Sequence, residues 1–200
     1  MRLGKRHDRR EGFHPVTLPT PVPPTRAVID ACVLFPVVPR VLTLAAARAG
    51  HLVPLWSDRI LEEWRRAVLA KRPEEAGAVA TEIAALRAAF VSAEVAPDPD
   101  LEASLSLPDP DDRHVLATAI AGGAHEIVTF NLSDFPGRTL ARHGIILRHP
   151  DEFLTEIAAG DPEYAQTVVD TCTEMSDAAP RSTLKRAKLP RLAKAIAAGG

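Results

Sequence analysis

The chain has 200 residues, of which 46% are hydrophobic and only 4% aromatic. This length suits one domain with short appendages, and an aliphatic core favours alanine-rich helices on a sheet over an all-β sandwich. No apolar run reaches the roughly 18 residues of a membrane span, and the basic N-terminus leads into prolines, so we expect neither a transmembrane helix nor a secretory signal. Cys32 and Cys172 are too few and too far apart for a disulfide framework or a zinc site, and a cytoplasmic location is expected.

The net charge of −2 conceals an uneven distribution of charged residues. Residues 27–177 contain 12 Lys and Arg against 24 Asp and Glu, whereas residues 181–200 contain six bases and no acid. An acidic body repels nucleic acid over long range, and basic ends could restore contact with phosphates. Solvated tails that only keep the chain in solution would show the same pattern, and the charges alone leave both interpretations open.

The first half of the chain alternates between strand and helix signals. Residues 1–25 are rich in proline and are predicted to be disordered. Residues 26–30 predict a strand that ends at Asp30, and residues 38–49 predict a helix. Residues 53–56 predict a short strand, after which Ser57 is the expected N-cap of a helix to about residue 69. Apolar residues spaced by three or four predict another helix from residue 73 to about residue 90.

The second half continues this alternation. Residues 96–110 contain four prolines and predict a loop, and a helix is expected from Asp111 or Asp112 to residue 122. Strands are predicted at 126–130 and 145–147, separated by a turn and a short helix, and residues 151–177 predict two further helices. Strands that alternate with helices predict an α/β fold with a mostly parallel sheet covered on both faces.

Four acids in separate segments are placed to meet at one edge of this sheet. Ligands of parallel sheets bind beyond the carboxyl ends of the strands. Asp30 ends the first strand, Asp134 follows the third predicted strand, and Asp112 begins the helix that leads into that strand. Glu63, about two turns into its helix, is the fourth candidate.

Carboxylates this close repel one another unless a cation joins them, and oxygen ligands favour Mg²⁺ or Mn²⁺. Such ions activate water and stabilise charge on a phosphate, so the cluster indicates phosphodiester hydrolysis. Each acid also has an ordinary interpretation: Asp30 as a turn residue, Glu63 as a solvated helix residue, and Asp112 and Asp134 as helix caps. Asp109 and Asp111 could be ordinary loop acids, or they could support the metal ligands without binding the metal. These residues alone leave the alternatives open.

The segments 28–34 (VIDACVL), 57–64 (SDRILEEW), 109–116 (DPDDRHVL) and 127–135 (IVTFNLSDF) resemble the four acidic motifs of the PIN-domain nucleases. Among these, the chain looks most like the VapC-type toxins of bacterial toxin–antitoxin pairs, and the resemblance covers about residues 26–155. It implies a three-layer αβα fold, and it divides the chain into an extension at 1–25, a nuclease domain at 26–155 and a helical segment with a basic tail at 156–200.

The resemblance also implies an endoribonuclease that uses one or two Mg²⁺ or Mn²⁺ ions, an inhibiting antitoxin and a possible homodimer. The family's four acids map to Asp30, Glu63, Asp112 and Asp134, and its polar positions to Thr129 and Asn131, which would orient a ligand or a metal-bound water. Glu63 is preferred to Glu62 because the family's acid usually lies six residues after the serine matched by Ser57.

Three features depart from the family pattern. Cys32 replaces a residue that is more often Asn, Ser or Thr, which would remove a polar group near the metal. Asn131 stands where Asp is frequent, which would weaken a second metal site. The proline-rich extension is unusual in this family.

Several neighbouring residues have two interpretations. Arg113 and Arg138 are placed to meet phosphate oxygens. His114 is expected at the surface, although it could contact substrate. Trp56 and Trp64 could stack on bases, but core packing is the more common fate of tryptophan.

Other classes of protein fit less well. An aspartyl phosphatase needs a second acid two residues after the first, where this chain has Cys32, and a receiver domain needs a lysine late in the sheet, which the late strands lack. An RNA-processing nuclease without an antitoxin and a catalytically inactive RNA-binding scaffold both remain alternatives.

Overall fold

The computed structural model describes residues 24–199. The extension predicted to be disordered over residues 1–25 lies outside the described residues except for its last two. Of those two, Thr25 already belongs to the first strand, β1.

The fold is built on a four-stranded parallel sheet. Its strands are β1 (Thr25–Ile29), β2 (Leu52–Leu55), β3 (Glu126–Val128) and β4 (Ile146–Arg148), in the order β2-β1-β3-β4. β1 is central, and Val28 of this strand pairs with Leu55 on one side and with Ile127 on the other. The α/β prediction with a parallel sheet is therefore confirmed, and each strand lies where the sequence placed it within a few residues.

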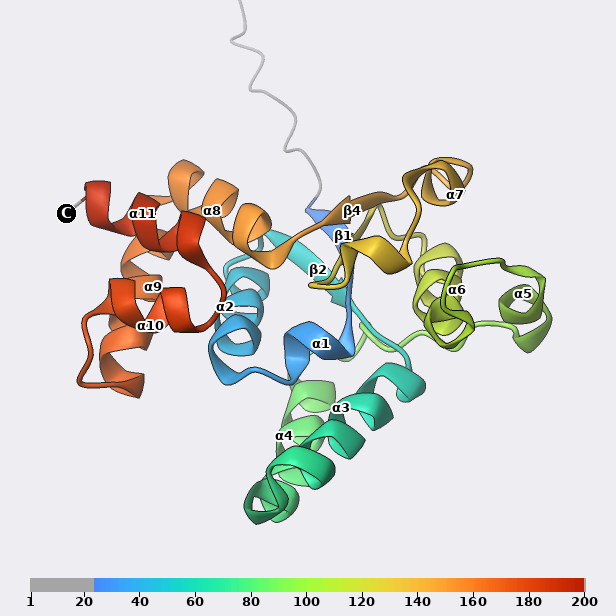
Figure 1. Cartoon of the computed structure of the whole chain (residues 1–200), viewed down its shortest axis with the longest axis horizontal. Coiled ribbons are helices and arrows are strands. Elements are labelled where there is room, and N and C mark those ends of the chain that lie inside the picture. Colours follow the sequence, from blue (N-terminus) through green and yellow to red (C-terminus); the bar gives the residue numbers. More distant parts are fainter. Residues whose placement is uncertain (1–23, 200) are drawn as a thin grey trace, which may run out of the picture.

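Helices cover the sheet and extend beyond it (Figure 1). The α-helices are α1 (Ala31–Leu34), α2 (Val37–Arg48), α3 (Asp58–Lys71), α4 (Ala76–Ala89), α5 (Pro99–Ser104), α6 (Arg113–Ala121), α7 (Gly137–Ala141), α8 (Pro150–Gly160), α9 (Pro162–Met175), α10 (Pro180–Arg186) and α11 (Pro190–Gly199). Single 3₁₀ turns are η1 (Pro73–Glu75), η2 (Pro110–Asp112) and η3 (Leu132–Asp134). Figure 1 shows α3 and α4 packed side by side, with α8 to α11 gathered on another side of the sheet.

Local capping explains several of these helix starts, including one that the sequence analysis missed. Ser57 accepts a hydrogen bond from the backbone N–H of Ile60 and caps α3, as predicted. The loop predicted over residues 96–110 is wrong in its first half, where α5 forms. The Asp98 side chain caps this helix, and Pro99 occupies its first turn, where the missing N–H costs nothing.

The core is aliphatic and contains both tryptophans. Ala27, Val28 and Ile29 of β1 are completely buried, and Trp56 and Trp64 are at most 1% exposed. A base could not stack on either indole, so these two side chains pack the core.

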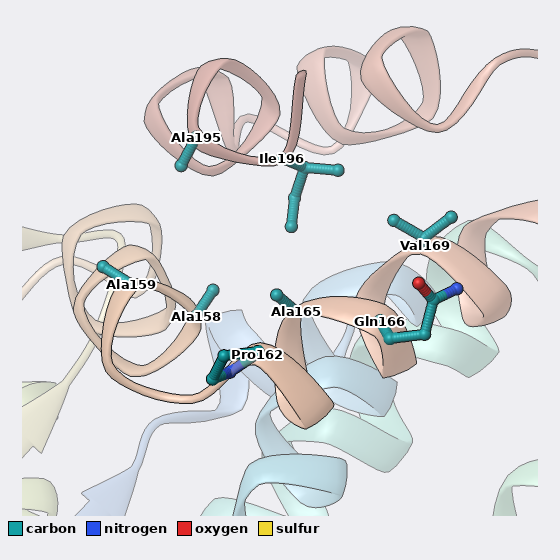
Figure 2. Close-up of a pocket in the computed structure, with 8 residues that line it drawn as sticks. All are labelled: Ala158, Ala159, Pro162, Ala165, Gln166, Val169, Ala195 and Ile196. Carbon is teal, nitrogen blue, oxygen red and sulfur yellow. The ribbon is translucent and has the colours of Figure 1, made fainter. Parts of the chain in front are cut away.

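The C-terminal segment is folded onto the rest of the chain. Leu184, Leu189 and Leu192 are buried, and α11 packs against α8. The buried carboxylate of Asp151 in α8 accepts hydrogen bonds from the backbone N–H groups at the start of α11, at 2.9 and 3.0 Å. Small side chains from α8, α9 and α11 line a pocket between these helices (Figure 2). The domain boundary expected after residue 155 falls inside α8.

Among the described residues, no helix combines the length and the apolar character needed to cross a bilayer.

Candidate active site

Asp30 lies immediately after the central strand, and the chain holds its carboxylate in place. Its backbone N–H continues the sheet by donating to Val128 at 3.1 Å, so the side chain emerges at the carboxyl edge. The hydroxyl of Thr129 donates to Asp30 Oδ2 at 2.6 Å, while Oδ1 has only a long contact of 3.4 Å from the backbone N–H of Cys32. The carboxylate is 4% exposed, so it is desolvated yet only partly satisfied by hydrogen bonds.

Cys32 belongs to the same hydrogen-bond network. Its Sγ lies 3.1 Å from Asp30 Oδ2 and accepts from the backbone N–H of Phe130 at 3.2 Å. Burial, with the nearby charge of Asp30, raises the pKa of the thiol to about 12. The protonated sulfur can therefore donate weakly toward Asp30. The thiol thus takes the place of the Asn, Ser or Thr side chain that is more common at this position in the family.

Thr129 and Asn131 follow β3 and extend the site. Thr129 is fully buried, and its hydroxyl accepts from the backbone N–H of Asn131 at 3.0 Å while it donates to Asp30. The side chain of Asn131 is exposed and lines a pocket together with Cys32 and Glu63. The structure thus brings Thr129 to Asp30 and places Asn131 at the mouth of the site.

Among the carboxylates of the site, Asp112 has a clearly raised pKa. Burial, followed by the negative charges of Asp30, Asp134 and Asp109, raises the pKa of Asp112 to about 6. Its side chain makes no capping bond to α6, because Asp109 caps the preceding turn by accepting from the backbone N–H of Asp111 at 2.9 Å. The interpretation of Asp112 as a helix cap is therefore excluded, and its carboxylate is available to the cluster.

Asp134 is half-buried in η3, where the Ser133 hydroxyl donates to its Oδ1 at 3.1 Å. Its side chain makes no capping hydrogen bond in that turn, whose N-cap residue is Asn131. Its negative charge contributes to the raised pKa of Asp112.

The structure separates the two adjacent acids of α3. Glu62 is held by Arg65 at 2.6 Å and Arg66 at 2.8 Å, and these hydrogen bonds lower its pKa. Glu63 instead faces the pocket that also contains Cys32 and Asn131. Glu63 is therefore the acid of this pair that lies with the site.

His114 is not the surface residue that the sequence predicted. It is 1% exposed, and its Nε2 lies 2.8 Å from Glu63 Oε1, although the ring is not aligned for a hydrogen bond. Arg59 Nε approaches the same Glu63 oxygen at 3.7 Å. Position 114 is on the inner face of α6, and the residue is buried because that face packs toward α3.

The two arginines expected near phosphate are placed differently. Arg113 begins α6 directly after Asp112, and its buried Nε has no hydrogen-bond partner among the described residues. Arg138 lies exposed on α7. Arg113 is therefore the arginine with unused donor capacity next to the carboxylates.

The residues of the site fit a hard divalent cation by their chemistry. Asp30, Asp112 and Asp134 supply oxygen donors, and burial, followed by the charges of the other acids, raises the pKa of Asp112. Within residues 24–199, no three acid, histidine or cysteine side chains already form a closed ligand set. An ion would therefore draw these side chains together.

Sequence reasoning missed two contributors to the site. From the sequence, Cys32 is expected to remove a polar group, whereas its thiol contacts Asp30. Its position two residues after Asp30 is the signal that indicates this contact. The cations Lys71, Arg186 and Lys188 line the same pocket as Glu63 and gave no signal beyond a general excess of base near the C-terminus.

Comparison with known proteins agrees with this fold. Residues 26–133, more than half of the chain, match the PIN domain family. The chain therefore belongs to the PIN-domain family, which confirms the predicted resemblance. Over 45 residues, 22% of this chain, it is 49% identical to VapC50 of Mycobacterium tuberculosis (strain ATCC 25618 / H37Rv), named as a putative ribonuclease. That alignment spans 27% of the relative, or about a quarter of its length, and no solved structure matches the chain.

Proposed function

We propose that the protein is an endoribonuclease that depends on Mg²⁺ or Mn²⁺ and cleaves RNA phosphodiester bonds. The observation that carries this proposal is the electrostatic coupling of Asp112 to Asp30 and Asp134 at the carboxyl edge of the sheet. Carboxylates from three segments of a fold are costly to hold together unless they bind a cation. The similarity to VapC50, named as a putative ribonuclease, supports RNA as the substrate.

Each residue has a distinct role in this proposal. Asp30, Glu63, Asp112 and Asp134 would hold one or two ions, which activate water and stabilise negative charge on the phosphate. Thr129 fixes the orientation of Asp30 by donating to Oδ2. Asn131 and Arg113 present donors to substrate oxygens, and Asp109 supports η2 and adds to the field at Asp112.

The same similarity supports a toxin of a toxin–antitoxin pair acting in the cytoplasm, with a small antitoxin protein as its inhibitor and a homodimer as its assembly. Co-expression with the product of an adjacent small gene tests this part. Relief of growth inhibition and a stable complex are expected for a toxin. Growth that is unaffected by the protein would favour an RNA-processing nuclease without an antitoxin.

The first experiment is cleavage of total RNA by the purified protein with Mg²⁺ or Mn²⁺. EDTA and Asp30→Asn should each abolish the fragments, and Asp111→Asn should retain them because that side chain is 93% exposed and outside the cluster. Retained cleavage in Asp30→Asn would contradict the proposed site. Well-folded protein that binds RNA but cleaves none would favour the inactive scaffold.

A further inference from the structure

The C-terminal helices help to form a pocket beside the candidate active site. This pocket of about 560 Å³ adjoins the carboxylates, a size suited to a small organic ligand. Cys32, Glu63 and Asn131 line the side nearest the candidate active site. The other side is formed by the end of α3, the end of α10 and the turn that follows α10, through Lys71, Arg186 and Lys188.

About half of the other cations in residues 24–199 are neutralised by carboxylates. Arg59, Arg65, Arg66 and Arg87 each form ion pairs with carboxylates. Within residues 24–199, Lys71, Arg186 and Lys188 have no acidic partner within 4.0 Å. Three cations without an ion-pair partner outnumber Glu63, which is the one acid among the described residues that lines the pocket, and this excess of positive charge suits an anion.

Lys188 adopts a backbone conformation that is unfavourable for lysine. Its φ of 61° lies in the left-handed region, and no other described residue apart from glycine has a positive φ. The backbone N–H of Leu189 donates to Leu184 at 2.9 Å, which closes α10 in the manner that usually places glycine at position 188. A glycine would fit here without strain, so the helix end does not explain the lysine. Its side chain supplies charge to the pocket.

The pocket also offers aromatic surface. Phe35 and Phe130 are partly buried and line it from α1 and from the end of β3. Lys71 Nζ lies over the ring of Phe35, 5.3 Å from its centroid, and the guanidinium of Arg72 lies over the same ring at 4.2 Å, so cations and an aromatic ring meet at this edge of the pocket. Aromatic faces beside cations are typical of sites that stack a base and bind its phosphate.

We propose that this pocket binds a nucleotide of single-stranded RNA next to the phosphate that is cleaved. Arg186, Lys188 and Lys71 contact the flanking phosphate, while Phe35 and Phe130 contact the base. The position beside the cleaved bond rests on the proposed function, whereas RNA binding by the pocket does not. Arg186 and Lys188 lie outside the residues that match the PIN domain family, so the C-terminal helices add this contact to the common fold.

The test measures binding of a fluorescent oligouridylate, in EDTA to prevent cleavage, across a range of salt concentrations. The variant Arg186→Gln/Lys188→Gly removes two pocket charges, and its glycine relieves the left-handed strain. The control Lys185→Gln/Lys194→Gln removes the same charge from exposed positions of α10 and α11 that do not line the pocket. Thermal melts should show the pocket variant to be at least as stable as the control.

The pocket variant should bind about tenfold more weakly than the control. Its salt slope should fall by up to about 0.7, because the pocket cations share one phosphate and each phosphate neutralised on a single strand contributes about 0.7. Phe35→Leu and Phe130→Leu should weaken binding at an unchanged slope. Equal affinities and slopes for the two charge variants would overturn the proposal. Because this assay needs no cleavage, its failure with an active wild-type nuclease would reject the pocket alone, and success with an inactive protein would reject only the nuclease.

Discussion

The repulsion within the carboxylate cluster has a measurable consequence for stability. The pKa of Asp112 is raised from 3.8 to about 6, so at neutral pH the folded protein holds a charge that the unfolded chain accommodates more easily. The shift of about two units corresponds to about 3 kcal/mol at most. Because Asp112 is partly exposed and screened by salt, about 1–2 kcal/mol is the expected destabilisation.

Asp112→Asn should therefore stabilise the metal-free protein by about 1–2 kcal/mol at pH 7. The sign follows from proton binding: between the unfolded and folded pKa values, the folded state binds more protons, so stability falls as pH rises from about 4 to 6. Below pH 4 both states are protonated, and the advantage of the variant should disappear. The measurement is urea unfolding in EDTA at pH 7 and at pH 4.

Asp111→Asn is the matched control, because Asp111 is adjacent but 93% exposed. It should leave stability unchanged within about 0.5 kcal/mol. Adding Mg²⁺ should then stabilise the wild-type protein and reduce the difference from Asp112→Asn, since an ion that binds only the folded state adds stability. An Asp112→Asn protein that is less stable than wild type at pH 7, or equally stabilised at pH 4, would refute the account of this cluster.

Three further substitutions test the fold around the site. Thr129→Val should cost about 1–3 kcal/mol and most of the nuclease activity, because Asp30 loses its shortest hydrogen bond; Thr129→Ser should restore both in unfolding and cleavage assays. Gly122→Ala should cost about 1–3 kcal/mol, since its β carbon would lie 2.9 Å from a leucine methyl of β2, whereas Gly137→Ala meets open space and should be neutral in the same thermal melts. Asp151→Ala should cost about 1–2 kcal/mol by removing the acceptor for α11, and unchanged unfolding would show that α11 is not anchored there.

The strands and the candidate acids could be predicted because their signals are local. Residues 27–29 form an apolar run that ends at an acid, and a central strand of a parallel sheet is expected to have that composition. The Ser57 cap fixes the start of α3 and hence the position of Glu63. Which of two adjacent acids faces the site is less certain from sequence, since it depends on the pairing of Glu62 with Arg65 and Arg66 along the same helix.

The features that escaped prediction depend on contacts between distant segments. His114 is polar and lies near a helix start, so its burial becomes visible only once α6 packs toward α3. The segment 181–200 has the charge of a solvated tail, yet a few apolar residues, among them Leu184 and Leu192, suffice to pack it against the fold. Removing residues 181–200 would therefore expose core surface, which makes substitution of individual cations the sharper test of RNA contact.

Negative charge is concentrated in residues 27–177 and positive charge in residues 181–200, and this separation has a physical reason. An acidic cluster suited to a divalent cation also repels the phosphates that it would cleave, and the surrounding body, with twice as many acids as bases over residues 27–177, adds to this repulsion. Cations placed among the carboxylates would pair with them and compete with the metal. Cations placed on the α10–α11 turn adjoin the same pocket from the opposite side, where they can attract RNA without occupying the carboxylate oxygens. The left-handed lysine at position 188 is consistent with this division, since it keeps a charge where a helix end alone would favour glycine.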